Sequence, residues 1–91
     1  MKKEDKNREK AQEYKELGKF YFLNRRYEEA ISAFKEALKL DPADATVYYS
    51  LGVSYEGINA VDEARECFKR ALEIDPNLES AQEHLDKLIG E

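Results

Sequence analysis

The stretch Tyr48–Pro76, YYSLGVSYEGINAVDEARECFKRALEIDP, decides the fold of this chain. Eight of its residues recur 34 positions earlier in the sequence, each at the same distance from the next. The two sets are Tyr14, Leu17, Gly18, Tyr21, Ala30, Phe34, Ala37 and Pro42, and Tyr48, Leu51, Gly52, Tyr55, Ala64, Phe68, Ala71 and Pro76. A repeat of this length is typical of arrays in which helical hairpins stack on one another. The sequence therefore predicts a protein built from repeated helical hairpins.

The spacing of apolar residues inside each repeat predicts the helices. Apolar side chains three and four positions apart form one face of an α-helix. The predicted helices cover residues 11–24, 27–40, 45–57, 60–74 and 79–89. Asp41-Pro42 and Asp75-Pro76 end the second and fourth helices, because proline lacks the backbone N–H that a helix needs. The predicted fold is all-α, a right-handed stack of antiparallel helix hairpins (an α-solenoid) with five helices.

Short side chains mark the predicted helix boundaries and the places of close packing. Asn24, Asp44 and Asn59 are the predicted N-caps of the second, third and fourth helices, because such side chains accept hydrogen bonds from free N–H groups. Gly18 and Gly52 each cost about 1 kcal/mol relative to alanine in a helix interior, so we expect another helix to approach closely there. The predicted buried face of the first helix consists of Ala11, Tyr14, Leu17, Gly18 and Tyr21.

The repeats divide the chain into four parts. Residues 1–10 are a charged N-terminal extension with five basic and three acidic side chains, which we expect to extend the next helix as a loosely ordered turn. Residues 11–44 and 45–78 are the two repeats. The pattern fails in residues 79–91, where Gln82 and Asp86 replace the expected tyrosine and glycine. We predict that this last part is a capping helix with a polar outer face.

Composition argues against several classes of protein. The 91 residues carry a net charge of −5, so no positive excess draws the chain to nucleic acid or to an anionic membrane. No apolar run reaches the roughly 20 residues that a membrane span needs. The single cysteine, Cys67, excludes an internal disulfide and fits a reducing compartment. We therefore expect a cytoplasmic protein.

The two sets of eight residues resemble the signature of the tetratricopeptide repeat family. That signature runs from an aromatic residue through Leu-Gly, Tyr, a small residue, an aromatic and a small residue to Pro, and both repeats match it throughout. The resemblance covers residues 11–78, and the last helix is similar to the family's usual solvating helix. Arg25 and Asn59 depart from the pattern, because the family usually has glycine in that turn. The resemblance implies a scaffold whose ligand depends on the residues of its groove.

The resemblance also implies which residues line that groove, because the first helix of each repeat faces a concave surface in this family. The corresponding residues are Gln12, Lys15, Lys19, Phe22, Thr46, Tyr49, Val53 and Glu56. The same correspondence adds Leu23, Gly57, Ser80, Glu83 and Lys87. Exposed aromatic side chains beside lysines suit a peptide or one face of a helix, with an acidic residue near Lys15 and Lys19. The alternative is that Phe22 and Tyr49 pack over neighbouring helices and the lysines are only solvated.

One tetratricopeptide subfamily binds the C-terminal carboxylate of heat-shock chaperones with basic residues and asparagines from three helices. Only Lys15 matches that pattern. Lys19 and Ser50 stand where asparagines are expected, and the fifth helix offers Glu79, Glu83 and His84 in place of its basic pair. We therefore do not expect this specific function.

The residues predict no catalytic site, metal site or cofactor. Cys67 and His84 are the only cysteine and histidine, and nothing in the sequence identifies an environment that would activate the thiol. We interpret Cys67 as unreactive and His84 as a partly exposed structural residue. Metal-ligand spacings and a phosphate-binding glycine loop are both absent from the sequence.

Two functions of different kinds remain open. The first is a non-catalytic protein-interaction module that binds another protein or a peptide in the concave groove. The second is an idealised or engineered repeat scaffold without a dedicated ligand, able to self-associate. We expect a monomer, with a weak homodimer through the array ends or the Phe22–Tyr49 strip as the alternative.

Overall fold

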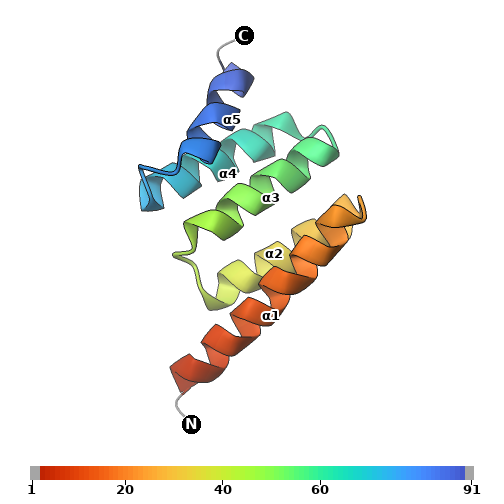
Figure 1. Ribbon diagram of the computed structural model, residues 1–91, viewed down its shortest axis with the longest axis vertical. Helices are drawn as coiled ribbons and strands as arrows, with labels where there is room; N and C mark the ends of the chain where they lie inside the picture. The colour runs from red at the N-terminus through yellow and green to blue at the C-terminus, as the bar shows by residue number, and fades with distance from the viewer. Residues whose placement is uncertain (1–2, 90–91) are drawn as a thin grey trace.

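The computed structural model describes residues 3–89, and within that range it contains five helices and no strand. The helices are α1 (Lys3–Leu23), α2 (Tyr27–Leu40), α3 (Ala45–Gly57), α4 (Val61–Ile74) and α5 (Glu79–Ile89). Figure 1 shows them as a stack, with the two termini at opposite ends of its long axis. The stack measures 49 × 28 × 16 Å. The predicted all-α repeat fold is confirmed.

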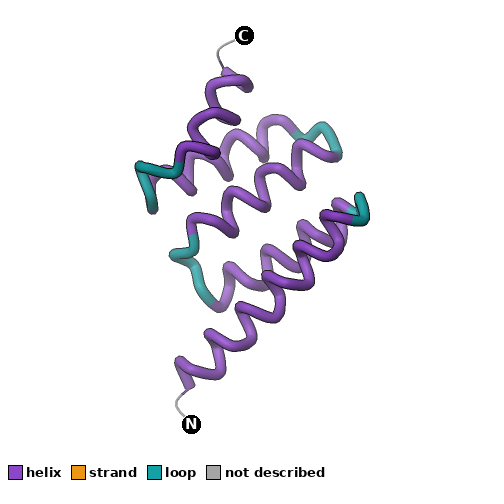
Figure 2. The backbone as a smooth tube through the Cα atoms, in the orientation of Figure 1, coloured by secondary structure: helices purple, strands orange, loops and turns teal. Residues whose placement is uncertain are grey.

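Two antiparallel hairpins and one final helix make up the stack. α1 packs along α2, α3 packs along α4, and the two hairpins meet where α2 lies against α3. α5 then packs on α4 at the end of the stack. Short turns join the helices, as Figure 2 shows. The groove-facing helices α1, α3 and α5 are thus brought to successive levels of one stack.

Two helices start at residues other than positions 11 and 60. α1 begins at Lys3, because the charged residues before position 11 continue the helix. Residues 1 and 2 of the predicted extension lie outside the described residues. α4 begins at Val61, because Asn59 has a positive φ of 62° and belongs to the turn.

The predicted caps are correct for one helix and wrong for two. The Asp44 side chain accepts hydrogen bonds from the backbone N–H groups of Thr46 and Val47, so it caps α3 as predicted. Arg26 and Ala60 occupy the N-cap positions of α2 and α4, and neither makes a side-chain capping bond. Asn24 instead donates from its side-chain amide to the carbonyl of Phe20, at the end of α1.

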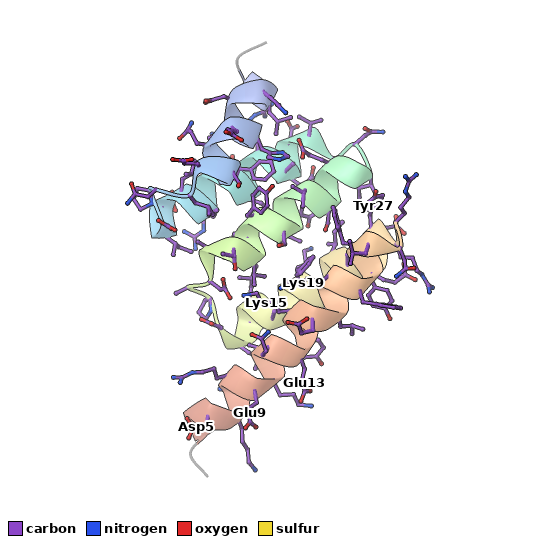
Figure 3. The ribbon with its side chains drawn as sticks, in the orientation of Figure 1. Asp5, Glu9, Glu13, Lys15, Lys19 and Tyr27 are labelled. Atoms are coloured by element: carbon purple, nitrogen blue, oxygen red, sulfur yellow. The ribbon has the colours of Figure 1, made fainter. Side chains whose placement is uncertain are left out.

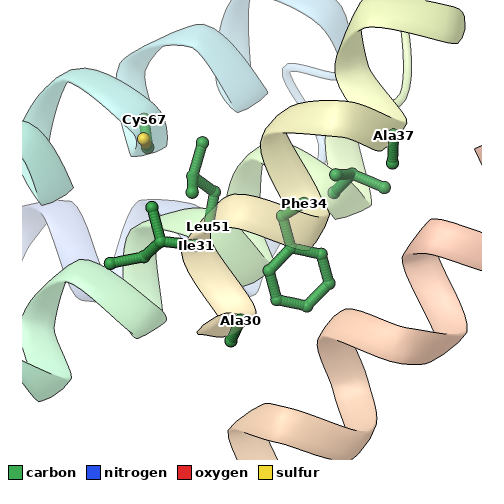
Figure 4. Packing of buried hydrophobic residues seen from close by; sticks show 7 residues of the cluster. Ala30, Ile31, Phe34, Ala37, Leu51 and Cys67 are labelled. Carbon is green, nitrogen blue, oxygen red and sulfur yellow. The ribbon is translucent and has the colours of Figure 1, made fainter. Parts of the chain in front are cut away.

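The buried side chains form two clusters, one for each junction of the stack. The first joins the first hairpin to α3 and contains Ala30, Ile31, Phe34, Ala37, Val47, Leu51 and Cys67. Figure 4 shows Ile31 of α2 pointing toward Leu51 and Cys67 of the second repeat. The second joins α3 and α4 to the last helix and contains Ala45, Ala64, Phe68, Ala71, Ala81 and Leu85. α5 therefore packs over the second repeat.

The glycines of the two repeats allow helices to approach, as the sequence predicts. A Cβ atom on Gly18 would lie 2.5 Å from the Phe34 ring, and one on Gly52 would lie 2.6 Å from the Phe68 ring. Both rings are almost fully buried. Each repeat therefore packs its aromatic residue directly on the backbone of its own first helix.

Leu17 is a correction to the predicted buried face of α1. It is 41% exposed, whereas its counterpart in the second repeat, Leu51, is 4% exposed. Leu51 is buried because α2 lies against α3. No helix of the described chain lies in the corresponding place against α1, so Leu17 is exposed.

Candidate functional site

A hollow of about 560 Å³ opens between the two hairpins on the groove side of the stack. Its lining comes from four of the five helices and consists of Lys19, Phe22, Leu23, Phe34, Tyr49, Ser50, Val53, Glu56 and His84. Most of these contribute carbon surface, and Leu23 is 80% exposed beside the hollow. A concave apolar surface with a few polar groups is the usual form of a ligand site.

The eight residues predicted for the groove divide into two groups. Five of them line the hollow together, namely Lys19, Phe22, Tyr49, Val53 and Glu56. The other three, Gln12, Lys15 and Thr46, lie toward the start of α1 and α3 and do not line it. Figure 3 shows Lys15 and Lys19 following one another along the side of α1 that faces α3.

Asp44 joins two members of the second group, Lys15 and Thr46. The ammonium of Lys15 lies 3.2 Å from the Asp44 carboxylate, and the Thr46 hydroxyl donates to the same carboxylate at 2.7 Å. Gln12 donates to Glu16 on the next turn of α1. Lys15 therefore already has an internal counter-ion. The Lys19 side chain is half exposed, and its ammonium lies 3.9 Å from the Glu16 carboxylate.

His84 forms a wall of the hollow, and this residue was not among the predicted groove residues. Its Nε2 lies 3.2 Å from the Tyr49 hydroxyl, and its Nδ1 lies 3.0 Å from the Glu56 carboxylate. Because an ionised carboxylate only accepts hydrogen bonds, Nδ1 carries the proton and donates to Glu56. The histidine ring also packs 5.2 Å from the centre of the Phe68 ring. These contacts tie α5 to α3 and fix the Tyr49 side chain.

Of the five further residues that the resemblance implied, Leu23 lines the hollow and the other four lie outside it. Ser80, Glu83 and Lys87 are exposed on α5, and Gly57 lies at the end of α3 against Tyr27. Two lining residues that were not predicted, Ser50 of α3 and His84 of α5, are 34 positions apart in the sequence. The repeat period that predicts the fold was therefore also a signal that these two positions share one surface.

The two candidate reactive residues have structural surroundings. Cys67 is buried in the first cluster, and burial raises the pKa of its thiol to about 11. At neutral pH it is therefore a thiol rather than a nucleophilic thiolate. Among the side chains described in residues 5–88 there is no group of three or more histidine, cysteine, aspartate or glutamate residues that could hold a metal ion. None of the helices in residues 3–89 is both long and apolar enough to cross a bilayer.

Comparisons with known proteins agree with the architecture. A family profile described as tetratricopeptide repeat matches residues 15–79. The chain belongs to the tetratricopeptide repeat family. This family is generally a non-catalytic protein-interaction fold, which agrees with the hollow on the groove side.

A curated relative and two solved structures show the range of similarity. The Hsp70-Hsp90 organising protein of Plasmodium falciparum is 38% identical over 52 residues, which are 57% of this chain and 21% of that protein. The chain thus spans about a fifth of the length of that relative. The yeast Sti1 TPR2AB domain in complex with pHSP90 has a TM-score of 0.85 at 30% identity, covering 88% of this chain and 31% of that one.

A second solved structure, the second TPR of Spaghetti (RPAP3) bound to the HSP90 peptide SRMEEVD, supports the fold. Its TM-score is 0.87 at 23% identity, and the match covers 91% of this chain and 77% of that one. These matches support a protein-interaction module. They give no support to the alternative of an idealised scaffold without a ligand.

Proposed function

We propose that this chain is a non-catalytic module that binds a short peptide of another protein in the hollow between α1, α3 and α5. The observation that carries the proposal is the 560 Å³ apolar hollow, which is open to solvent beside Leu23. Its volume lies within the roughly 300–1,000 Å³ typical of ligand sites.

An apolar side chain of the peptide is the proposed anchor. Phe22, Tyr49 and Val53 line the hollow from α1 and α3. Burying one aliphatic or aromatic side chain there would contribute about 1.5–3 kcal/mol. The Tyr49–His84–Glu56 hydrogen bonds hold the aromatic wall in place before a ligand arrives, which reduces the entropy lost on binding.

Lys19 is the proposed contact for an acidic residue next to the anchor. It lies at the edge of the hollow with half of its side chain exposed. Lys15 is less available, because Asp44 already pairs with its ammonium at 3.2 Å. We therefore propose one acidic position in the ligand rather than two.

This ligand differs from a chaperone C-terminus held by its carboxylate. Such a clamp needs basic groups from more than one helix, and here α5 presents His84, bonded to Glu56, with exposed Glu83 beside it. The relatives' binding of HSP90 peptides therefore supports a peptide-binding role, while the side chains of this groove favour an internal apolar motif.

A selection from a random peptide library tests the proposal. The whole chain serves as bait, and the Leu23→Asp and Leu17→Asp variants serve as matched baits, because both leucines are exposed on α1 and only Leu23 lines the hollow. We expect peptides with an apolar residue flanked by an acid to be enriched on the wild type and on Leu17→Asp, and lost on Leu23→Asp. Enrichment that is equal on all three baits would contradict the proposal.

A further inference from the structure

A second hollow lies on the opposite side of the first hairpin, at the end of the stack. Its volume is about 450 Å³. We call this surface the α1–α2 outer face, and it consists of Tyr14, Leu17, Tyr21, Glu28, Glu29, Ser32, Ala33 and Glu36. None of these residues lines the groove hollow. The outer face is therefore a separate surface from the proposed peptide site.

The internal repeat shows how such a surface is covered elsewhere in the same molecule. The counterparts of Leu17 and Ala33, 34 positions later, are Leu51 and Cys67. Leu51 and Cys67 are 4% and 8% exposed, because α2 packs over them. Leu17 has the same place in its repeat but is 41% exposed, whereas the small side chain of Ala33 is 5% exposed without a covering helix. The chain thus contains one copy of this surface with a covering helix and one copy without.

The covering helix has a simple pattern of side chains. Ile31 and Leu38 of α2 pack with the first cluster, and they are two turns apart on that helix. Between them, the Lys35 ammonium lies 5.8 Å from the centre of the Tyr55 ring. The pattern is an aliphatic residue, a lysine four positions later and a second aliphatic residue three positions after that. Tyr21 is the counterpart of Tyr55 on the outer face.

Charge around the outer face disfavours a second copy of this chain. Glu29 pairs with Arg26, just before α2, and Glu36 pairs with Lys39 of α2, but Glu28 makes no ion pair with the side chains described in residues 5–88. Two outer faces in contact would bring their Glu28 side chains together. The opposite end of the stack, α5, exposes Glu79 and Asp86, which are also acidic. A lysine-bearing helix avoids both repulsions.

We propose that the α1–α2 outer face docks one amphipathic helix of another protein, with aliphatic residues at positions i and i+7 and a lysine at i+4. The aliphatic side chains cover Leu17 and the half-buried rings of Tyr14 and Tyr21. The lysine pairs with Glu28, because Arg26, which pairs with Glu29, already lies 5.6 Å from the centre of the Tyr21 ring.

A peptide with the sequence of Tyr27–Leu40, with both ends blocked, is a probe that carries this pattern. It is titrated into the isotope-labelled whole chain and followed by the backbone amide resonances. We expect those of Tyr14, Leu17 and Tyr21 to shift and that of Val53 to stay. Leu17→Asp should weaken binding by about tenfold or more, while the matched Leu23→Asp variant keeps the wild-type affinity.

Several results would overturn the proposal. One is no binding of the probe to the wild-type chain, and another is equal binding of a probe with Ile31→Asp and Leu38→Asp. Shifts confined to the groove, or to Leu51, Tyr55 and Cys67 of the second repeat, would show that the probe binds elsewhere. Sedimentation of the chain alone should give the 10.6 kDa monomer. A dimer that Leu17→Asp dissociates would make a second copy the occupant and would also overturn the proposal.

Discussion

Gly52 allows the Phe68 ring to lie directly on the backbone of α3. Helix propensity alone predicts that Gly52→Ala stabilises the protein by about 1 kcal/mol. The structure predicts the opposite sign, because the new Cβ would lie 2.6 Å from a fully buried ring, and overpacking costs about 1–3 kcal/mol. Urea unfolding measures the difference. Gly18→Ala repeats the test against Phe34, and a gain of stability in both variants would contradict the packing.

Asp44 combines a helix cap with an ion pair, and its effect on stability should depend on pH. Partial burial raises its pKa, but hydrogen bonds from Thr46 and Lys15, the Lys15 charge and the Val47 N–H together hold the pKa below its ordinary value. A carboxyl whose pKa is lower in the folded state stabilises the protein above its unfolded pKa, and this contribution is lost as the pH falls through the folded pKa.

Asp44→Ala should therefore lower the free energy of unfolding by about 1 kcal/mol at pH 7, the usual cost of a lost cap. The difference from the wild type should shrink in acid, at a pH below the ordinary value of 3.8, as the Asp44 carboxylate of the wild type takes up its proton at its lowered pKa. Urea unfolding at both pH values measures it. Asp62→Ala is the control, because that exposed side chain pairs only with Arg65 on its own helix. An equal effect of Asp44→Ala at both pH values would show that its charge is unimportant.

At the scale of the elements, the two turns inside the hairpins differ in strain. Arg25 and Asn59 have φ values of 61° and 62°, a left-handed conformation that costs most side chains about 1–2 kcal/mol and asparagine less. Arg25→Gly should stabilise the protein by up to about 1 kcal/mol, since glycine adopts this conformation without a Cβ clash but loses more entropy on folding. Asn59→Gly should gain less. Thermal and urea unfolding compare them, and a larger gain at Asn59 would argue against strain at Arg25.

The helices that the sequence predicts well are those with an apolar stripe. α2, α3 and α5 have the predicted bounds, because their stripes end at proline, glycine or a capping aspartate. The start of α1 did not follow from the pattern, because residues 1–10 carry no apolar periodicity to show where the helix begins. Asn24 and Asn59 were predicted as caps from their side chains alone. Their hydrogen bonds and backbone angles show turn roles, which residue type does not distinguish from capping.

At the scale of the whole molecule, the repeat period predicted the stack, and the family resemblance implied most of the residues that line the groove hollow. It did not show that Asp44 pairs with Lys15, because that contact joins two helices through a turn whose path depends on tertiary packing. It also left His84 out, because the correspondence with the family pointed to its neighbour Glu83. The exposure of Leu17 depends on what lies beside the first repeat, which a pattern within the repeat cannot contain.

The absence of a carboxylate clamp is a prediction about the whole groove. The peptide SRMEEVD, labelled at its N-terminus, should bind this chain weakly and equally well as a free acid and as a C-terminal amide. Fluorescence anisotropy measures both. The second TPR of Spaghetti (RPAP3), which is known bound to this peptide, is the positive control. Tight binding that amidation abolishes would mean that Lys15 leaves Asp44 to hold a carboxylate.

The most direct test of the groove is the dissociation constant of the best selected peptide, measured by calorimetry for the wild type, Leu23→Asp and Leu17→Asp. Leu23 is 80% exposed, so its replacement should leave the fold intact, and circular dichroism checks this. We predict that Leu23→Asp weakens binding by about tenfold or more, since an aspartate beside the hollow opposes both the apolar anchor and the acidic neighbour. Leu17→Asp should match the wild type. Equal affinity of all three proteins would contradict a peptide site between α1, α3 and α5.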